Sequence, residues 1–340
     1  MTDAKRPSMQ DVADASGVHR TTVSLALRGS PRLPASTRDH VLAVAERLGY
    51  KAHPMISALM TARAGRRQPE HQGTLAFLRL DDQPPPDWQH GSFSYAWLFQ
   101  GAAARAKQRG YTLQPMWLNE PGLTPARFMQ LLTAKNITGI FIAPHSGSQH
   151  RVALDWQHYS VIEFGYNMAD PLFHRVVHDY FHAMQTVFAY ALTKGYQRIG
   201  FALPQRADVK THHLWTSAYL HAQQSVSTAN RIPLYMPINI ATEELRVWRH
   251  KHQLDVMILG GHHYPLQEKI ALPFTIPENL PVISLDCRDR YGQIPGIFQD
   301  WPAMGAAAAD MLIDQLHRGE FGVPTQPRSL LVSGLWNPGE

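Results

Sequence analysis

The sequence predicts a small all-α head followed by a larger α/β body that contains two doubly wound parallel sheets. Up to Gln68, apolar residues recur at helical spacing, and this stretch holds eleven Lys and Arg against five Asp and Glu. After Gly73, short apolar runs alternate with longer helical segments, a pattern typical of parallel strands joined by helical crossovers. The roughly 265 residues of this second part are enough for two such sheets.

Three short helices are expected in the head. The first, MQDVADAS, follows Ser8 and ends at Gly17, and the second runs from about Arg20 to Arg28. The third begins near Ala35 and ends at Gly49. The expected inward positions are Val23, Ala26 and Leu27 in the second helix and Val41, Leu42, Ala45 and Leu48 in the third. The tight turn between the first two helices predicts a helix-turn-helix unit.

A possible short helix, PMISALM, and a polar linker from Gly65 to Gly73 separate the head from the body. In the body, strands are expected in TLAFLRL, ITGIFIAP, YSVIEFGY, RIGFALP, LDVMILGG and LPVISLD. Helices are expected in FQGAAARAKQRG, FHAMQTVFAYALTKG, HLWTSAYLHAQQ and WPAMGAAAADMLIDQLHRG.

Composition and charge narrow the class of protein. A lone cysteine, Cys287, excludes an intramolecular disulfide and favours a reducing compartment. No stretch of about 20 apolar residues occurs, so we expect a cytoplasmic protein without a membrane partner. The head carries a net charge of +6 and the rest of the chain −1. A basic head on a nearly neutral body indicates a polyanionic partner.

The second helix has the chemistry of a DNA-reading helix. His19, Arg20 and Thr21 occupy its N-terminal end, where such a helix enters the major groove. Thr22, Ser24 and Thr37 can donate hydrogen bonds to phosphates. The alternative is a small helical interaction module, which the concentration of positive charge disfavours.

The stretch MQDVADASGVHRTTVSLALRG, with the later STR and LGY, resembles the head of the LacI family of bacterial transcription regulators. The rest of the chain is similar to the family's effector domain, a pair of α/β subdomains like those of type I periplasmic binding proteins. The resemblance implies a DNA-binding transcription regulator, a repressor, that binds a pseudo-palindromic operator as a homodimer. A small-molecule effector in the cleft of the α/β domain would control it.

The resemblance also implies the domain boundaries. The DNA-binding head spans 1–52, the hinge helix and linker 53–72, and the effector-binding and dimerisation domain 73–340. Within the last, one subdomain takes about 73–177 and 302–325, and the other about 178–298 and 326–337.

Carried over residue by residue, the family's base contacts fall on Arg20, Thr21 and Leu25. The positions near the DNA backbone or in the hinge are His19, Thr22, Ser24, Arg28, Thr37, Tyr50 and His53. Leu59 matches the leucine that opens the central base step from the minor groove; a buried helix residue is the alternative. Leu25 stands where the family usually has arginine, and Arg28 where it has asparagine, so an atypical operator is expected.

The effector site departs from the family's sugar-binding pattern. Gly165, Trp215 and Gly260 stand where sugar-responsive members carry polar groups, whereas Asp286 and Trp301 retain the pattern. This argues against a free monosaccharide and favours a bulkier or flatter, carbohydrate-related ligand. Phe99, Tyr166, Trp215 and Trp301 are the aromatic residues expected at the site, and core packing is the alternative for each.

We expect no cofactor, no metal and no catalysis. The pairs His212-His213 and His262-His263 lack a Cys or acidic ligand at metal spacing. Nucleophile elbows, phosphate-binding glycine loops and paired acids are absent from the sequence. The competing interpretations are a solute receptor with a basic partner-docking head and an enzyme with a control head. The C-terminal LWNPGE has no heptad pattern, which favours a dimer over a tetramer.

Overall fold

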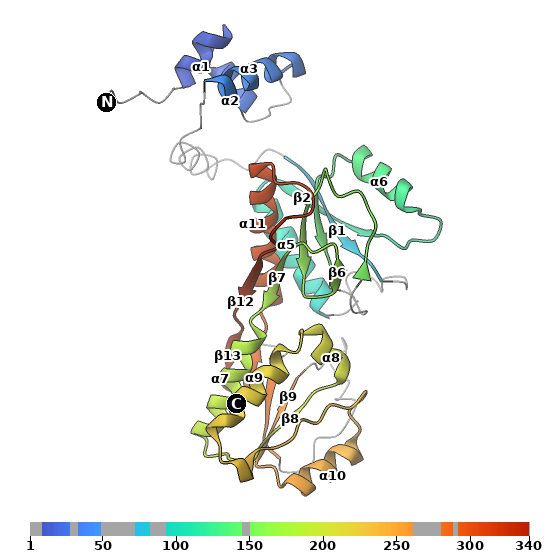
Figure 1. Cartoon of the computed structure of the whole chain (residues 1–340), viewed down its shortest axis with the longest axis vertical. Coiled ribbons are helices and arrows are strands. Elements are labelled where there is room, and N and C mark those ends of the chain that lie inside the picture. The colour runs from blue at the N-terminus through green and yellow to red at the C-terminus, as the bar shows by residue number, and fades with distance from the viewer. Residues whose placement is uncertain are drawn as a thin grey trace, which may run out of the picture. The chain divides into compact units, whose positions relative to one another are not determined.

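The computed structural model describes residues 9–27, 33–48, 72–81, 93–144, 150–260, 280–287 and 292–339. The chain divides into two compact units, 1–69 and 70–340, and each is described by itself (Figure 1). Several predicted positions lie outside the described residues: Arg28, Tyr50, the hinge helix with His53 and Leu59, and the pair His262-His263.

The head is a three-helix unit whose elements are α1 (Met9–Ser16), α2 (Arg20–Leu27) and α3 (Ala35–Arg47). Its core consists of Val12, Ala13, Val23, Ala26, Val41, Val44 and Ala45. The expectation for Leu42 is wrong, because its side chain is 41% exposed and Val44 is buried instead. Positions 41, 44, 45 and 48 lie on one face of a 3.6-residue helix, and position 42 lies about 100° away from 41.

The first lobe of the body contains a six-stranded parallel sheet in the order β12-β7-β5-β3-β1-β2. Its strands are β1 (Gly73–Arg79), β2 (Tyr111–Trp117), β3 (Gly139–Ile142), β5 (Ser160–Phe164), β7 (His174–His178) and β12 (Ser329–Val332). Helices α5 (Phe93–Gln108) and α11 (Trp301–Arg318) cover one face, and α6 (Pro125–Ala134) covers the other. A small parallel pair, β4 (His150–Arg151) and β6 (Met168–Asp170), lies beside this sheet.

Helices α5 and α11 approach each other closely because glycine stands at the crossing. A Cβ at Gly101 would overlap the Pro302 carbonyl oxygen. A Cβ at Gly305 would similarly overlap the Leu98 carbonyl. The backbone contact that these two glycines permit fixes α11 over the first sheet.

The second lobe contains a five-stranded sheet in the order β13-β11-β10-β9-β8. Its strands are β8 (Ile199–Ala202), β9 (Val256–Leu259), β10 (Val282–Cys287), β11 (Gly296–Phe298) and β13 (Leu335–Asn337), of which only β13 is antiparallel. Its helices are α7 (Tyr180–Thr193), α8 (Gln205–Lys210), α9 (Leu214–Ala222) and α10 (Thr242–His252), with 3₁₀ turns at Gln223–Ser225 and Thr228–Asn230. Helices α7 and α9 pack on one core and α10 on another.

The chain passes between the lobes after β7, after β11 and after β12, as Figure 1 shows. The last passage corrects the predicted division, which assigned 326–337 to the second subdomain. Strand β12 pairs with β7 in the first sheet, Leu330 opposite Val176, and only β13 joins the second sheet. The fold class itself is confirmed: a short helical head precedes an α/β body with two parallel-type sheets. Among the described helices, none has the length and apolar character needed to cross a membrane.

Candidate functional site

The N-terminal end of α2 presents polar side chains to solvent. His19, Arg20 and Thr21 are all exposed. The His19 carbonyl accepts the Thr22 N–H at 2.8 Å and starts the helix. The His19 Nδ1 lies 2.7 Å from the Thr21 hydroxyl, so the histidine orders the first turn. The structure therefore places the three predicted groups together at an exposed helix N-terminus, where backbone N–H groups also attract anions.

Leu25 lies on the same face of α2, one turn beyond Thr21. It is half-buried and does not belong to the core of the head. Ser24 is half-buried one turn beyond Arg20, and Thr37 is half-buried in the first turn of α3. Leu25 therefore adds an apolar side chain to the face of α2 that carries Thr21, and it is not part of the core of the head.

In the body, a row of aromatic side chains crosses from the first lobe to the second. The Trp301 and His178 rings meet edge to face with centroids 4.5 Å apart. His178 and Tyr180 follow at 6.0 Å, and Tyr180 and Trp215 at 5.1 Å. Trp301 begins α11, His178 ends β7, and Tyr180 begins α7. The row thus follows the passage of the chain between the lobes, at the carboxyl end of β7.

Several buried polar atoms of this row have no hydrogen-bond partner in the described chain. They are the indole nitrogens of Trp215 and Trp301 and both ring nitrogens of His178. Trp215 is 3% and His178 2% exposed. Burial lowers the pKa of His178 to about 3, so its imidazole is neutral. Buried donors left without partners are rare in proteins and indicate a place where a ligand or water completes the hydrogen bonding.

Two carboxyl groups of the body have raised pKa values, and one of them, Asp286, lies near the aromatic row. Burial raises the pKa of Asp286, at the end of β10, to about 7. The pKa of the Tyr180 phenol is also raised, chiefly by burial and in addition by the negative charge of Asp286. Glu163, on β5, is 1% exposed, and burial raises its pKa to about 7. Its Oε1 accepts the Met168 N–H at 2.8 Å, and its Oε2 lies 3.6 Å from Arg175.

The predicted effector residues divide into two groups. Tyr166, Trp215, Asp286 and Trp301 lie along or beside the aromatic row. Phe99 packs edge-on against Phe77 at 5.4 Å in the first-lobe core.

The two predicted glycines, Gly165 and Gly260, each have a structural explanation. Gly260 is buried, and a Cβ there would touch Leu203, Phe201 and Leu285 at 3.0–3.3 Å. Gly165 has a left-handed φ of +92° that shapes the turn before Tyr166. The absence of a side chain at these positions is therefore explained by packing and by the turn.

Sequence reasoning missed His178, Tyr180, Glu163 and Arg175. Glu163 and Arg175 face each other across the β5–β7 pairing, a relation that depends on strand register. A charged residue inside the apolar run YSVIEFGY was the available signal for Glu163. The described part of the chain contains no group of three or more His, Cys, Asp or Glu that could hold a metal ion.

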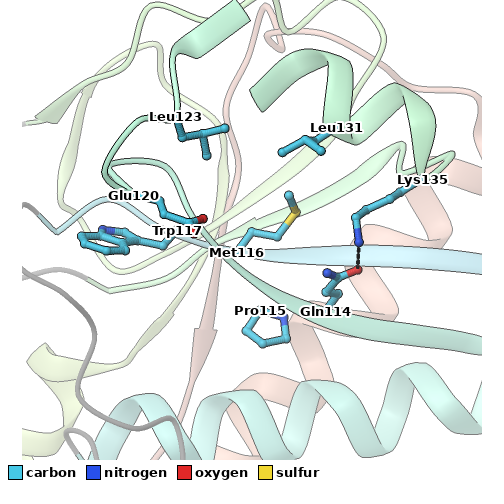
Figure 2. Close-up of a pocket in the computed structure, with 8 residues that line it drawn as sticks. All are labelled: Gln114, Pro115, Met116, Trp117, Glu120, Leu123, Leu131 and Lys135. Carbon is cyan, nitrogen blue, oxygen red and sulfur yellow. Dashed lines mark hydrogen bonds between the residues drawn. The ribbon is translucent and has the colours of Figure 1, made fainter. Parts of the chain in front are cut away.

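A separate groove of about 340 Å³ lies on the edge strand β2 beneath α6 (Figure 2). Its lining comprises Gln114, Pro115, Met116, Trp117, Glu120, Leu123, Leu131 and Lys135. The Lys135 ammonium donates to the Gln114 side-chain oxygen at 3.2 Å. This groove shares no residue with the aromatic row.

Residues 8–53 match the family described as bacterial regulatory proteins, lacI family. The chain carries a lacI-family helix-turn-helix domain. This confirms the resemblance predicted from the head motifs. Among curated proteins, the maltose regulon regulatory protein MalI of Escherichia coli K12 is 30% identical over 148 residues. That match covers 44% of this chain and 39% of MalI, so it spans less than half of the relative's length.

Solved structures share the fold of both parts. A lac repressor dimer bound to operator and the anti-inducer ONPF matches with a TM-score of 0.50 at 14% identity, covering 98% of each chain. The transcription regulator CcpA of Lactococcus lactis matches with a TM-score of 0.53 at 13% identity, covering 78% of this chain and all of that one. The two-lobed body therefore has the periplasmic-binding-protein-like fold of lacI-family regulators.

Proposed function

We propose that this protein is a DNA-binding transcription regulator of the lacI type, acting as a repressor on a pseudo-palindromic operator. The observation that carries the proposal is the lacI-family match of residues 8–53 together with the exposed, polar N-terminal end of α2. In this role Arg20, Thr21 and Leu25 contact base edges, and His19, Thr22, Ser24 and Thr37 contact the backbone. The sequence predicts four further DNA contacts, at Arg28, Tyr50, His53 and Leu59.

The body acts as the sensor in this proposal. A small-molecule effector related to carbohydrates binds between the lobes, with Trp215, Trp301 and Asp286 among its contacts. The unpartnered indole nitrogens and the neutral His178 support this placement. Ligand binding shifts the balance between lobe arrangements, and the homodimer transmits that shift to the two heads. The role is regulatory rather than catalytic, and it would place the protein with the DNA in the bacterial cytoplasm.

Arg20 and Thr37 have different roles, and binding-site selection separates them. Arginine pairs with the O6 and N7 of guanine and is worth about 1–3 kcal/mol of discrimination. Arg20→Ala is therefore expected to relax the preference at one base pair of each half-site. Thr37→Ala removes a side-chain hydroxyl that donates to the DNA backbone, and it is expected to weaken binding to all sequences alike.

The experiment selects duplexes from a random pool with the purified full chain and each variant. An unchanged preference for Arg20→Ala would show that Arg20 does not read a base. Absence of any enriched palindrome with the unaltered chain would favour a solute receptor with a partner-docking head.

A further inference from the structure

The turn between α8 and α9 holds two consecutive residues in the left-handed region of the backbone. His212 has a φ of +54° and His213 a φ of +60°. Each such residue other than glycine is strained and persists only where its surroundings hold it. Local contacts explain how His213 is held: its N–H donates to the Asp208 carbonyl at 2.9 Å, and its Nδ1 lies 2.7 Å from the buried Asp208 carboxylate. Both contacts lie within the second lobe.

The backbone N–H of His212 donates to the Val209 carbonyl at 3.0 Å within the second lobe, but its side chain contacts the other lobe. Its imidazole stacks on the phenol of Tyr166, with ring centroids 5.0 Å apart and an interplanar angle of 30°. Tyr166 belongs to the turn after β5 of the first lobe. Lys210, at the end of α8, also lies within the electrostatic influence of the first lobe. Its pKa is lowered chiefly by burial, and the negative charge of Asp81, two residues after β1, opposes that change.

In the first lobe, hydrogen bonds and a cation–π contact hold Tyr166 in place. The Gly165 N–H donates to the Val176 carbonyl at 3.2 Å, and the Glu163 carboxylate accepts the Met168 N–H at 2.8 Å. These two bonds bracket Tyr166 on either side in the sequence. The Arg175 guanidinium lies 5.3 Å from the centre of the Tyr166 ring, within cation–π range. The ring on which His212 stacks is therefore fixed to the first sheet.

We propose that His212 is a positioning residue: by stacking on Tyr166 it clasps the second lobe to the first and closes the cleft between the lobes at the α8–α9 turn. The inference rests on the proposed function in that Tyr166 borders the effector site. Because the imidazole covers the phenol ring, a ligand reaches that ring face only when the α8–α9 turn moves. The strained backbone at 212–213 favours that movement once the stack is lost. The turn thus couples occupation of the cleft to contact between the lobes.

Hydrogen exchange of the full chain, followed by mass spectrometry without DNA or ligand, tests the clasp. An aromatic stack of this kind corresponds to a roughly 2- to 12-fold change in a local opening equilibrium. His212→Ala is expected to speed exchange by that factor in peptides covering 164–168 and 208–216. His212→Phe, which keeps a stacking ring, is expected to restore the slow exchange.

His213→Ala is the matched control because it alters the same turn but removes only the bond to Asp208. It is expected to change peptide 208–216 and leave 164–168 unchanged. Unchanged exchange at 164–168 in His212→Ala, or failure of His212→Phe to restore it, overturns the clasp. Operator selection with the unaltered chain is scored separately. Its failure refutes the proposed function and leaves the exchange result standing.

Discussion

Glu163 makes the stability of the body depend on pH, and Glu163→Gln removes that dependence. Burial raises the pKa of this carboxyl from 4.5 to about 7. A group that holds its proton more tightly when folded stabilises the fold at low pH, and this stability is lost as the pH rises through the folded pKa. The contribution of Glu163 to the stability of the wild-type protein should therefore fall between pH 5 and pH 8, whereas glutamine does not titrate.

The magnitude follows from the size of the shift. One pKa unit corresponds to about 1.4 kcal/mol, so the contribution of Glu163 to the free energy of unfolding changes by roughly 2–3 kcal/mol between pH 5 and pH 8. The Arg175 charge is already one of the influences that set this pKa, and glutamine replaces the protonated carboxyl without adding a titrating group. Asp286, whose pKa is also raised to about 7, affects both proteins equally and cancels in the comparison.

Urea unfolding followed by tryptophan fluorescence measures this difference. All eight tryptophans lie after residue 69, so the signal reports the body alone. The variant is expected to gain roughly 2–3 kcal/mol relative to wild type as the pH rises from 5 to 8. Glu120→Gln, at an exposed position after β2, is the control for the loss of a carboxylate on the surface. A constant difference for Glu163→Gln would refute the reasoning.

Two further substitutions test the packing inside each lobe by the same urea assay. Gly305→Ala places a methyl group against the Leu98 carbonyl, forces α5 and α11 apart, and should cost about 1–3 kcal/mol; an unchanged midpoint would show that the crossing is loose. Tyr219→Phe removes a buried hydroxyl that lies 2.9 Å from the Ile199 and 3.0 Å from the Ile232 carbonyl, and should cost about 1–2 kcal/mol. A neutral result there would mean that neither carbonyl depends on this donor.

The sequence was sufficient for elements whose burial follows a simple period. The three helices of the head were predicted because their apolar residues recur at helical spacing, and β3, β8 and β9 because each is a continuous apolar run buried on both faces. Strand β2 was missed because Gln114 and Pro115 interrupt its pattern, which an edge position tolerates. Strand β12 was not predicted, and the segment 326–337 that contains it was assigned to the second lobe. The largely exposed residues of β12 carry no burial signal, and only its pairing with β7 places it in the first lobe.

The candidate cleft was predictable only in part for a similar reason. Tyr166 and Asp286 end predicted strands, and Trp215 and Trp301 lie at the start of predicted helices, so their positions could be placed from sequence. The role inferred for His212 depends on a left-handed backbone and on a ring from the other lobe, and neither has a signature in the chain.

The central claim is that the head reads DNA sequence, and the ratio of specific to non-specific affinity tests it most directly. The full chain is titrated with a selected palindromic duplex and with its scrambled counterpart at two salt concentrations. We predict weaker binding to both at higher salt, because phosphate contacts release counterions, and a preference of about 10³-fold or more for the palindrome. Equal affinity for the two duplexes would contradict the account.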